Sequence, residues 1–436
     1  MNNQSHSSQL RVALAGLGTV GAGVYKILTQ NADLIKTRTG KTIEVVAVSA
    51  RNKSKDRGVD LSAVEWVDNP KSLATRHDVD VVVEMMGGEG DPAFSLVKSA
   101  LGNGKSVVTA NKSLLAHHGL ELAALAEQSN VSLMYEAAVA GGIPIIKMIR
   151  EGLAANNIAG LYGIMNGTCN YILTTMERTG QSFGEVLKEA QALGYAEADP
   201  TLDVGGGDSG HKLALLTALA FGCKPDFDGL SLDGIDKLTA EDLTVAAEFD
   251  CRIKLIGQAK KLDDGRVLQM VGPCLVQKTS PLAHVDGVLN GIFVHGDFVG
   301  PSFTSGRGAG EGPTASAIVA DLMDLASGIS RPVFGVPTRS LNPSPTASSD
   351  DWNGKFYIRL VVHDRPGVIA EIAPVLRDRK ISIESLIQRG RSADQPVSII
   401  LTTHETTGAD MHEAAGQIGK LGCVLGQPLV LPILNI

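Results

Sequence analysis

Asp208 and Lys212 stand four residues apart where an apolar helical pattern begins. Residues at this spacing share one helix face, so a carboxylate and an ammonium would project side by side. Such a pair could bind a small polar molecule that carries an amine and a reactive oxygen. A helix cap with a solvated partner four residues on explains the same spacing, and spacing alone favours that alternative. Further carboxylates precede the pair at Glu197, Asp199 and Asp203. These nearby acidic residues favour a binding site.

A second chemical motif lies near the N-terminus. A buried strand pattern over 10–15 runs into GLGTVG and then into a helical pattern. The glycines allow a tight turn and a close approach of the backbone to a pyrophosphate, which then lies at the helix N-terminus. A plain glycine-rich turn is the alternative, but a GxGxxG between a strand and a helix favours a nucleotide. The expected dinucleotide-binding residues are Gly16, Leu17, Gly18, Thr19, Val20 and Gly21.

The end of the next predicted strand, over 43–48, bears on the type of dinucleotide. NAD sites usually place Asp or Glu there to bind the adenosine ribose. This chain instead has Ser-Ala-Arg-Asn-Lys at 49–53. No carboxylate in that segment repels a 2'-phosphate, and Arg51 and Lys53, next to Ala50, could bind one. We expect NADP, or both NADP and NAD, as the cofactor; two solvated basic side chains, above all Lys53, are the alternative.

Alternating strand and helix patterns continue through predicted strands at 79–85, 106–109 and 132–135. They predict an α/β fold with an N-terminal Rossmann domain, a doubly wound parallel sheet over 1–144. Ligands bind at the carboxyl ends of the strands in such sheets. Lys112 follows the strand at 106–109 and is therefore a candidate cofactor-binding and catalytic residue, although a lone lysine after a strand is otherwise uninformative.

The segment EAAVAGGIP at 136–144 leads into a different pattern. Its small residues let the backbone bend and expose carbonyl groups that could hold a cation, although a tight interdomain crossing is favoured by the residues alone. We place an α+β substrate domain at 145–305. Its polar turn NGTCN at 166–170 either offers amides to a substrate or caps a helix. A glycine-rich loop then opens a segment at 306–338 that either returns to pack on the Rossmann domain or forms an interdomain turn.

The C-terminal part begins after a linker-like composition at 339–354. Residues 355–436 show the order βαββαβ, which predicts a ferredoxin-like domain. They contain no catalytic constellation. We expect a chain cut after Gly354 to stay active.

The composition excludes several classes of protein. A length of 436 residues fits two or three domains, and a formal charge of −8 without a basic stripe argues against a nucleic-acid partner. The five cysteines are scattered without CxxC spacing, so neither a zinc site nor a disulfide framework is indicated. The polar N-terminus lacks a signal-peptide core, and no apolar run is long enough for a membrane span. We expect a cytoplasmic protein with no membrane partner.

Taken together, the motifs resemble the homoserine dehydrogenase family over nearly the whole chain. GLGTVG, TANK, EAAVAGGIP, NGTCN, GYAEADPTLDVGGGDSGHK and GAGEGPTA occur in the order typical of that family. The segment after the linker, with HDRPGVIAEIA, resembles an ACT domain, a module that binds amino acids as feedback effectors. Cys169 is a small departure, because threonine is more common there.

The resemblance implies reversible hydride transfer between NAD(P)H and L-aspartate 4-semialdehyde, which gives L-homoserine. It implies that Lys212 is the general acid and that Lys112 assists it or orders the substrate and the nicotinamide. Glu197 and Asp208 would hold the substrate amino group, with Asp203 in support. Gly310 would contact the cofactor. A cation, expected to be sodium, would be held mostly by backbone carbonyls of the loop that contains Glu136, Val139, Gly141 and Ile143.

The resemblance also implies L-threonine as the effector at the ACT domain, and a homodimer through the substrate domain or a homotetramer. Two alternatives stay open. One is another amino-acid dehydrogenase of the same architecture. The other is a non-catalytic regulator that uses the ACT domain to bind an amino acid, against which the intact Asp208, Lys212 and Glu197 argue.

Overall fold

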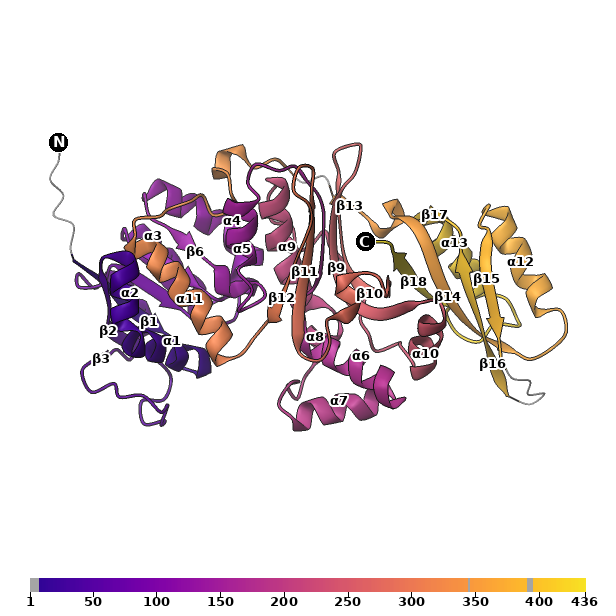
Figure 1. Cartoon of the computed structure of the whole chain (residues 1–436), viewed down its shortest axis with the longest axis horizontal. Helices are drawn as coiled ribbons and strands as arrows, with labels where there is room; N and C mark the ends of the chain where they lie inside the picture. Colours follow the sequence, from indigo (N-terminus) through magenta and orange to yellow (C-terminus); the bar gives the residue numbers. More distant parts are fainter. Residues whose placement is uncertain (1–7, 344–345, 390–394) are drawn as a thin grey trace. The chain divides into compact units, whose positions relative to one another are not determined.

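The computed structural model describes residues 8–343, 346–389 and 395–436. The polar N-terminal residues 1–7 and residues 344–345 of the expected linker lie outside the described residues. The chain divides into two compact units, each assembled from three stretches of sequence. The first unit comprises Met1–Ala159, His211–Asp228 and Val294–Ser344, and the second comprises Gly160–Gly210, Gly229–Phe293 and Pro345–Ile436. Figure 1 shows the elements of each unit coloured along the sequence.

The first unit contains a parallel sheet with the order β3-β2-β1-β4-β5-β6. This is the strand order of a Rossmann fold, and it confirms the predicted doubly wound sheet. The strands read as continuous apolar runs because helices cover both faces. The strands are β1 (Gln9–Ala15), β2 (Thr42–Ser49), β3 (Glu65–Trp66), β4 (Val81–Glu84), β5 (Ser106–Thr109) and β6 (Leu133–Met134).

Helix α11 (Glu311–Ala326) comes from a late stretch of sequence but packs on the early helix α1 (Thr19–Gln30). A Cβ on Gly23 would lie 2.7 Å from Cγ of Glu311, so only glycine permits this approach. Lys26 and Glu311 form an ion pair at 2.7 Å across the same contact. The other helices of this unit are α2 (Ala32–Thr39), α3 (Ala93–Gly102), α4 (Lys112–Gln128) and α5 (Ile145–Lys147), with a π-helical turn at Met148–Gly152.

The second unit contains a mixed sheet that includes the path β7-β9-β10-β18-β14-β16-β15. Its first strands are β7 (Ile158–Ile164), β9 (Cys251–Lys261) and β10 (Val267–Gln277), with β8 (Ser231–Leu232) at the edge of β10. The hairpin strands β11 (Leu289–Gly296) and β12 (Gly300–Arg307) follow in the chain. The helices of this part are α6 (Gly167–Thr179), α7 (Phe183–Ala192), α8 (Thr201–Val204) and α10 (Ala240–Glu248), and α9 (Gly207–Phe221) starts here and continues into the first unit.

The C-terminal part has the predicted order βαββαβ. Its sheet runs β18-β14-β16-β15, the arrangement of a ferredoxin-like domain. In α12, the side chains of Val368, Ile372 and Leu376 are buried at helical spacing. The elements are β14 (Asn353–His363), α12 (Val368–Asp378), β15 (Ile383–Gln388), β16 (Pro396–Thr403), β17 (Thr406–Thr407), α13 (Gly408–Ile418) and β18 (Leu429–Leu434).

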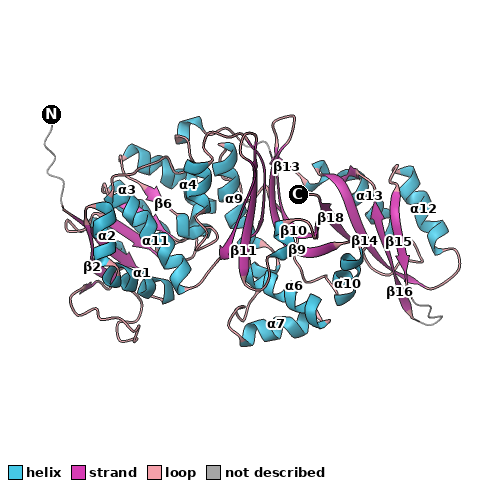
Figure 2. Cartoon of the chain, viewed as in Figure 1, coloured by secondary structure: helices cyan, strands magenta, loops and turns pink. Residues whose placement is uncertain are grey.

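Strand β18 joins this C-terminal domain to the preceding sheet. It pairs in parallel with β10 on one side and antiparallel with β14 on the other (Figure 2). On β14, the hydroxyl of Tyr357 donates to Asp242 at 2.8 Å, and Arg359 binds the same carboxylate at 2.7 Å. Asp242 lies on α10 and is fully buried. The stretch with linker-like composition also contributes β13 (Thr346–Ala347), which pairs with β10.

No helix among the described residues combines the length and the apolar character that a membrane crossing needs.

Candidate active site

The turn between β1 and α1 has the backbone geometry that a bound pyrophosphate needs. Gly16 lies at φ +98°, and a Cβ there would approach the carbonyl oxygen of Met85 to 2.6 Å. A Cβ on Gly21 would lie 2.3 Å from the carbonyl oxygen of Gly16. Both positions therefore exclude other residues, and the first turn of α1 can come close to a phosphate.

A cavity of about 760 Å³ adjoins this turn. Its lining includes Arg51 and Lys55 from the loop after β2 and Met85 from the end of β4. Lys53 is not among the lining residues, and its ammonium lies 6.0 Å from the ring of Trp66. The cavity has the size of a small-molecule site and lies at the carboxyl ends of β1 and β4, where the strand order reverses. Its glycine turn and basic residues fit a dinucleotide.

Arg57 fastens the basic loop to the glycine turn. Its Nε donates to the carbonyl oxygen of Leu17 at 2.7 Å, and its other nitrogens donate to the carbonyl oxygens of Asn52 and Lys55. Its guanidinium also lies 5.3 Å from the centre of the Trp66 ring. No local sequence pattern indicates this role, because it depends on contacts between segments 40 residues apart.

Lys112 is the first residue of α4, and a hydrogen-bond network fixes the backbone before it. Asn111 caps the helix by accepting from the backbone of Leu114 at 3.1 Å. Its own backbone donates to Thr109, whose hydroxyl donates to Glu84 at 2.6 Å. Glu84 is fully buried at the end of β4, and burial raises the pKa of its carboxyl. The network joins the carboxyl ends of β4 and β5 and so positions Lys112.

In the second unit, Asn166 joins the carboxylates of Asp203 and Asp208. Its side-chain nitrogen donates to Asp203 at 2.7 Å and to Asp208 at 2.8 Å. Its side-chain oxygen accepts from the backbone of Cys169 at 2.8 Å and thereby caps α6. The polar turn is therefore a helix cap, and it also assembles an acidic pair. Asn166 and Asp208 are both almost fully buried.

Glu197 lies on the loop between α7 and α8. Its side chain is exposed, and its backbone carbonyl accepts from the side chain of Gln191 at 3.1 Å. The loop that carries it is tied to the NGTCN turn by Thr168, whose hydroxyl donates to the carbonyl oxygen of Tyr195 at 2.6 Å. Asp199 accepts from the backbone and the hydroxyl of Thr201, so it forms a local turn before α8.

Helix α9 carries both members of the pair that the spacing singled out, Asp208 in its first turn and Lys212 one turn later. Lys212 is half-buried. The neighbouring His211 is buried, and its ring stacks on Phe227 with centroids 4.3 Å apart. It also meets His117 of α4 edge-on at 5.4 Å. The aromatic contacts therefore join the helix that starts with Lys112 to the part of α9 that carries Lys212.

The loop expected to hold a cation is buried and tightly turned. Ala140 and Gly141 are both left-handed, at φ 56° and 50°, and a Cβ on Gly141 would lie 2.4 Å from the carbonyl oxygen of Gly308. Val139 and Ile143 are also buried. Among the described residues, no group of three or more His, Cys, Asp or Glu side chains could hold a metal, so any cation here would rely on backbone oxygens.

Glu136, at the start of that loop, caps α5. Its two carboxylate oxygens accept from the backbones of Ile146 and Lys147, each at 2.9 Å. Its own backbone donates to Asp321 at 2.9 Å. Burial and the nearby charge of Asp321 raise the pKa of Glu136 to about 7, and burial raises the pKa of Asp321 to about 6. The charges of Lys147 and Arg150 oppose the rise at Asp321.

Three family models match the chain in succession. A model of the homoserine dehydrogenase NAD-binding domain matches residues 16–136, a homoserine dehydrogenase model matches 144–323, and an ACT domain model matches 356–423. A homoserine dehydrogenase of Neisseria gonorrhoeae is 44% identical over 421 residues, which cover 95% of this chain and 96% of the relative. The chain belongs to the homoserine dehydrogenase family.

Solved structures of homoserine dehydrogenases share the fold. The enzyme from Thiobacillus denitrificans has a TM-score of 0.91 and 42% identity, with 98% of each chain covered. A hyperthermophilic archaeal homoserine dehydrogenase in complex with NADPH has a TM-score of 0.61 and 26% identity over 72% of this chain and 97% of that one. The resemblance to the family and its ACT domain is confirmed, and the chain is an NAD(P)-dependent oxidoreductase.

Among the residues predicted from the sequence, Asp203 and Asp208 are joined through the side chain of Asn166. Residues of the glycine turn and Arg51 line the same cavity. Gly310 lies at φ +117° immediately before α11. Glu84 and Arg57 were missed, and so was the link from Asn166 to Asp203 and Asp208. A glutamate at the end of an apolar strand is a signal that could have identified Glu84, because a charge there must find partners.

Proposed function

We propose that this homoserine dehydrogenase reduces L-aspartate 4-semialdehyde to L-homoserine with NADPH as its preferred cofactor. The observation that supports the site is the acidic pair Asp203 and Asp208, held by Asn166 at the start of the helix that carries Lys212. The helix offers the carboxylate of Asp208 for the substrate ammonium and, one turn on, the ammonium of Lys212 for the reacting oxygen.

A few side chains carry out substrate binding, positioning and proton transfer. NADPH, when bound, supplies the hydride that the aldehyde carbon accepts. Lys212 donates a proton to the aldehyde oxygen as negative charge develops there, which yields the alcohol. Lys112 orders the substrate and the nicotinamide beside it. Asp208 and Glu197 bind the substrate ammonium, and Asp203 keeps Asp208 and Asn166 in place. In the reverse direction Lys212 accepts the proton.

The preference for NADPH rests on the basic loop. Arg51 and Lys55 line the cavity at the glycine turn, and Asp68 is the one carboxylate among its described lining residues. An arginine there binds a 2'-phosphate through two parallel hydrogen bonds. Gly310 would contact the cofactor from the N-terminus of α11.

A sodium ion at the loop of Glu136, Val139, Gly141 and Ile143 is part of the proposal. Hard cations take oxygen ligands, and a buried loop of small residues offers backbone carbonyls. Because both carboxylate oxygens of Glu136 accept backbone hydrogen bonds, this residue would act through its carbonyl and its charge. Replacing sodium by choline in the assay should lower the rate, and an unchanged rate would contradict the cation site.

The ACT domain supports regulation by an amino acid, and we propose L-threonine as the effector. The β11–β12 turn supports a homodimer, which ACT pairing would extend to a homotetramer, because Phe298 is 89% exposed and Val299 is 46% exposed there. All five cysteines are buried and free, which fits a reducing compartment such as the cytoplasm.

The first test measures NADPH oxidation with L-aspartate 4-semialdehyde, repeated with NADH and with L-threonine. Lys212→Ala should lower kcat by about 10²- to 10⁴-fold and leave the Kd of NADPH unchanged, since the lysine acts on the substrate oxygen. Lys188→Ala, an exposed lysine of α7, is the matched control. Loss of NADPH binding together with turnover would contradict the role of Lys212 as acid.

A further inference from the structure

Lys254 is a charged side chain in the interior of the second unit. It lies on β9, and only 1% of its side chain is exposed. Its ammonium donates to the carbonyl oxygen of Val285 at 2.6 Å, to the side-chain oxygen of Asn170 at 3.2 Å and to the carboxylate of Asp286 at 3.1 Å. A buried ammonium costs free energy unless such partners compensate for its lost hydration. The proposed mechanism makes no use of this charge.

Arg252, two residues earlier on the same face of β9, binds the same part of the chain. Its guanidinium donates to the carbonyl oxygen of Ala283 at 2.6 Å and pairs with Asp286 at 2.9 Å. Its Nε donates to Glu177 of α6 at 2.9 Å. Burial and the charge of Arg252 lower the pKa of Lys254 to about 8, and the carboxylates of Asp286 and Glu177 oppose this shift. The ammonium is therefore charged at neutral pH.

Asn170 of α6 holds residues 285–289, the clamped segment, from the other side. Its side-chain nitrogen donates to the carbonyl oxygens of Gly287 at 2.9 Å, Val285 at 3.0 Å and Leu289 at 3.3 Å. Its side-chain oxygen is the acceptor for the buried ammonium. The ammonium and the amide therefore bind each other and the same segment, so the loss of one weakens the hold of the other.

The clamped segment packs on the turn that assembles the acidic pair. A Cβ on Gly167 would lie 2.8 Å from the carbonyl oxygen of Val288, so the two backbones are in close contact. Asn170 follows Asn166 by one helical turn, and its backbone donates to the carbonyl oxygen of Asn166 at 3.2 Å. A displacement of the clamped segment would therefore move the first turn of α6, together with the amide that binds the acidic pair.

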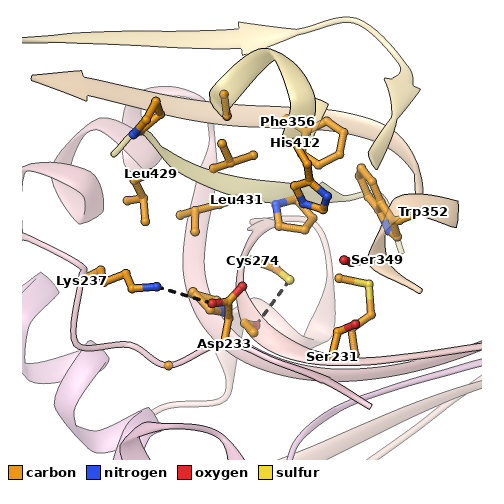
Figure 3. A pocket seen from close by; sticks show the side chains of 18 of the residues that line it. Ser231, Asp233, Lys237, Cys274, Ser349, Trp352, Phe356, His412, Leu429 and Leu431 are labelled. Atoms are coloured by element: carbon orange, nitrogen blue, oxygen red, sulfur yellow. Dashed lines mark hydrogen bonds and ion pairs between the residues drawn. The ribbon is translucent and has the colours of Figure 1, made fainter. Parts of the chain in front are cut away.

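The buried ammonium is separate from the cavity beside β10 that Figure 3 shows. This cavity of about 540 Å³ is lined by residues of β10, β14, α13 and β18, including Cys274. Cys274 is opposite Lys254 in the register of β9 and β10, yet none of the described residues of β9 lines the cavity. A substitution at Lys254 therefore leaves the residues that line this cavity unchanged.

We propose that Lys254 is a positioning residue for the substrate site. Its ammonium and the Asn170 side chain hold residues 285–289 against the first turn of α6. This contact fixes the Asn166 amide that binds the acidic pair. Lys254 acts through Asn166 and makes no contact with the substrate. The effect on substrate binding rests on the proposed function, whereas the effect on the first turn of α6 does not.

Steady-state kinetics of Lys254→Met test the effect on substrate binding. Methionine has a similar length but cannot donate a hydrogen bond. The KM for L-aspartate 4-semialdehyde should rise at least fivefold, whereas kcat and the KM for NADPH should change less than twofold. Lys260→Met, at an exposed position of the same strand, is the matched control and should leave all three constants unchanged. An unchanged KM for the semialdehyde in Lys254→Met, or an equal rise in both KM values, would overturn the proposal.

Asp286→Ala is a second variant that leaves the interior intact, because the side chain of Asp286 is 50% exposed. Its loss removes the carboxylate that Arg252 and Lys254 share, so the KM for the semialdehyde should rise at least twofold. Asp263→Ala, at the exposed turn between β9 and β10, is the control. If Lys254→Met does not fold, Asp286→Ala decides the proposal by itself, and an unchanged KM would then refute it.

Amide hydrogen exchange tests the clamp without any substrate. The backbones of Cys169 and Asn170 donate to Asn166, so their amides report on the first turn of α6. In Lys254→Met, peptides that contain these amides should exchange at least threefold faster by mass spectrometry, and peptides of β1 should keep the original rate. The original rate in both Lys254→Met and Asp286→Ala would refute the clamp. If the chain turned over no semialdehyde, the proposed function would fail while the exchange still decided whether Lys254 positions this turn.

Discussion

Asn166 satisfies three groups with one side chain. It caps α6 and holds the carboxylates of Asp203 and Asp208, which would otherwise repel each other in a partly buried setting. A single amide therefore determines where the proposed binding site for the substrate ammonium lies.

Asn166→Asp tests this role with almost no change in shape. The variant keeps the oxygen that caps α6 but places a third carboxylate where the structure has a donor. Hydrogen bonds to charged groups contribute about 1.5–3 kcal/mol each, so the KM for the semialdehyde should rise by roughly 10- to 100-fold. The KM for NADPH should not change. Steady-state kinetics measure both, and an equal rise in both constants would mean that the whole structure is disturbed.

Glu136 predicts a pH dependence of stability. The pKa of Glu136 is about 7 in the folded chain, above its ordinary value of 4.5. The folded chain therefore keeps this proton up to a higher pH than the unfolded chain does. Stability therefore falls between about pH 4.5 and 7, by about 3 kcal/mol from this group. Asp321, with a pKa of about 6, acts in the same direction.

Glu136→Gln should make the apparent Tm less dependent on pH between 5 and 8. It should also lower the Tm at every pH, because the amide can accept only one of the two backbone hydrogen bonds. Differential scanning fluorimetry at pH 5, 6.5 and 8 measures this. Glu44→Gln, at an exposed position of β2, should keep the original slope. The same slope in Glu136→Gln would show that Glu136 does not titrate in this range.

At the scale of elements, the basic loop after β2 is held at both ends. It leaves the sheet at Ser49, whose carbonyl accepts from Gly16 at 2.9 Å, and Arg57 returns it to Leu17. Only part of the loop therefore faces the cavity, and Arg51 belongs to that part whereas Lys53 does not.

This geometry predicts different effects when Arg51 and Lys53 are each replaced by aspartate. Arg51→Asp should lower the ratio of kcat/KM for NADPH over NADH by roughly 10- to 100-fold, since it replaces the proposed phosphate ligand with a repelling charge. Lys53→Asp should change the ratio only a few fold. Initial rates with NADPH and NADH measure the ratio for each variant. A larger effect at Lys53 than at Arg51 would mean that Lys53 is the phosphate ligand.

The features of the fold that depend on local sequence patterns were the ones that could be predicted from the sequence. The glycine turn, the doubly wound sheet and the ferredoxin-like domain follow from the patterns of single elements and from their order along the chain, and all three were predicted. Asn166 and Arg57 act across longer separations, which periodicity does not encode. The pairing of β18 with β10 was not predicted for the same reason, because each strand pattern shows that a strand forms but not which edge it joins.

In the molecule as a whole, side-chain contacts and strand pairing attach the C-terminal domain to the preceding sheet, in addition to the linker. Tyr357 and Arg359 hold Asp242, and β13 and β18 both pair with β10. Removing the domain would take away these partners of Asp242 and would expose an edge of the sheet.

A chain cut after Gly354 should therefore lose stability. Loss of this ion pair and of the β10–β18 pairing should lower the apparent Tm by roughly 5–15 °C. Thermal unfolding of the cut chain measures this, and Arg359→Met in the full chain should reproduce part of the fall. A cut chain with the original Tm would mean that the domain is an independent module.

The shared edge of β10 and β18 also has a consequence during synthesis. The ribosome completes β10 roughly 150 residues before it starts β18. At about 5–20 residues per second, the edge of β10 waits on the order of 10–30 s for its partner. During that time Leu275 and Val276 of β10 lack the strand with which they later pair and are open to other nascent chains, so this protein should depend on chaperones during its synthesis.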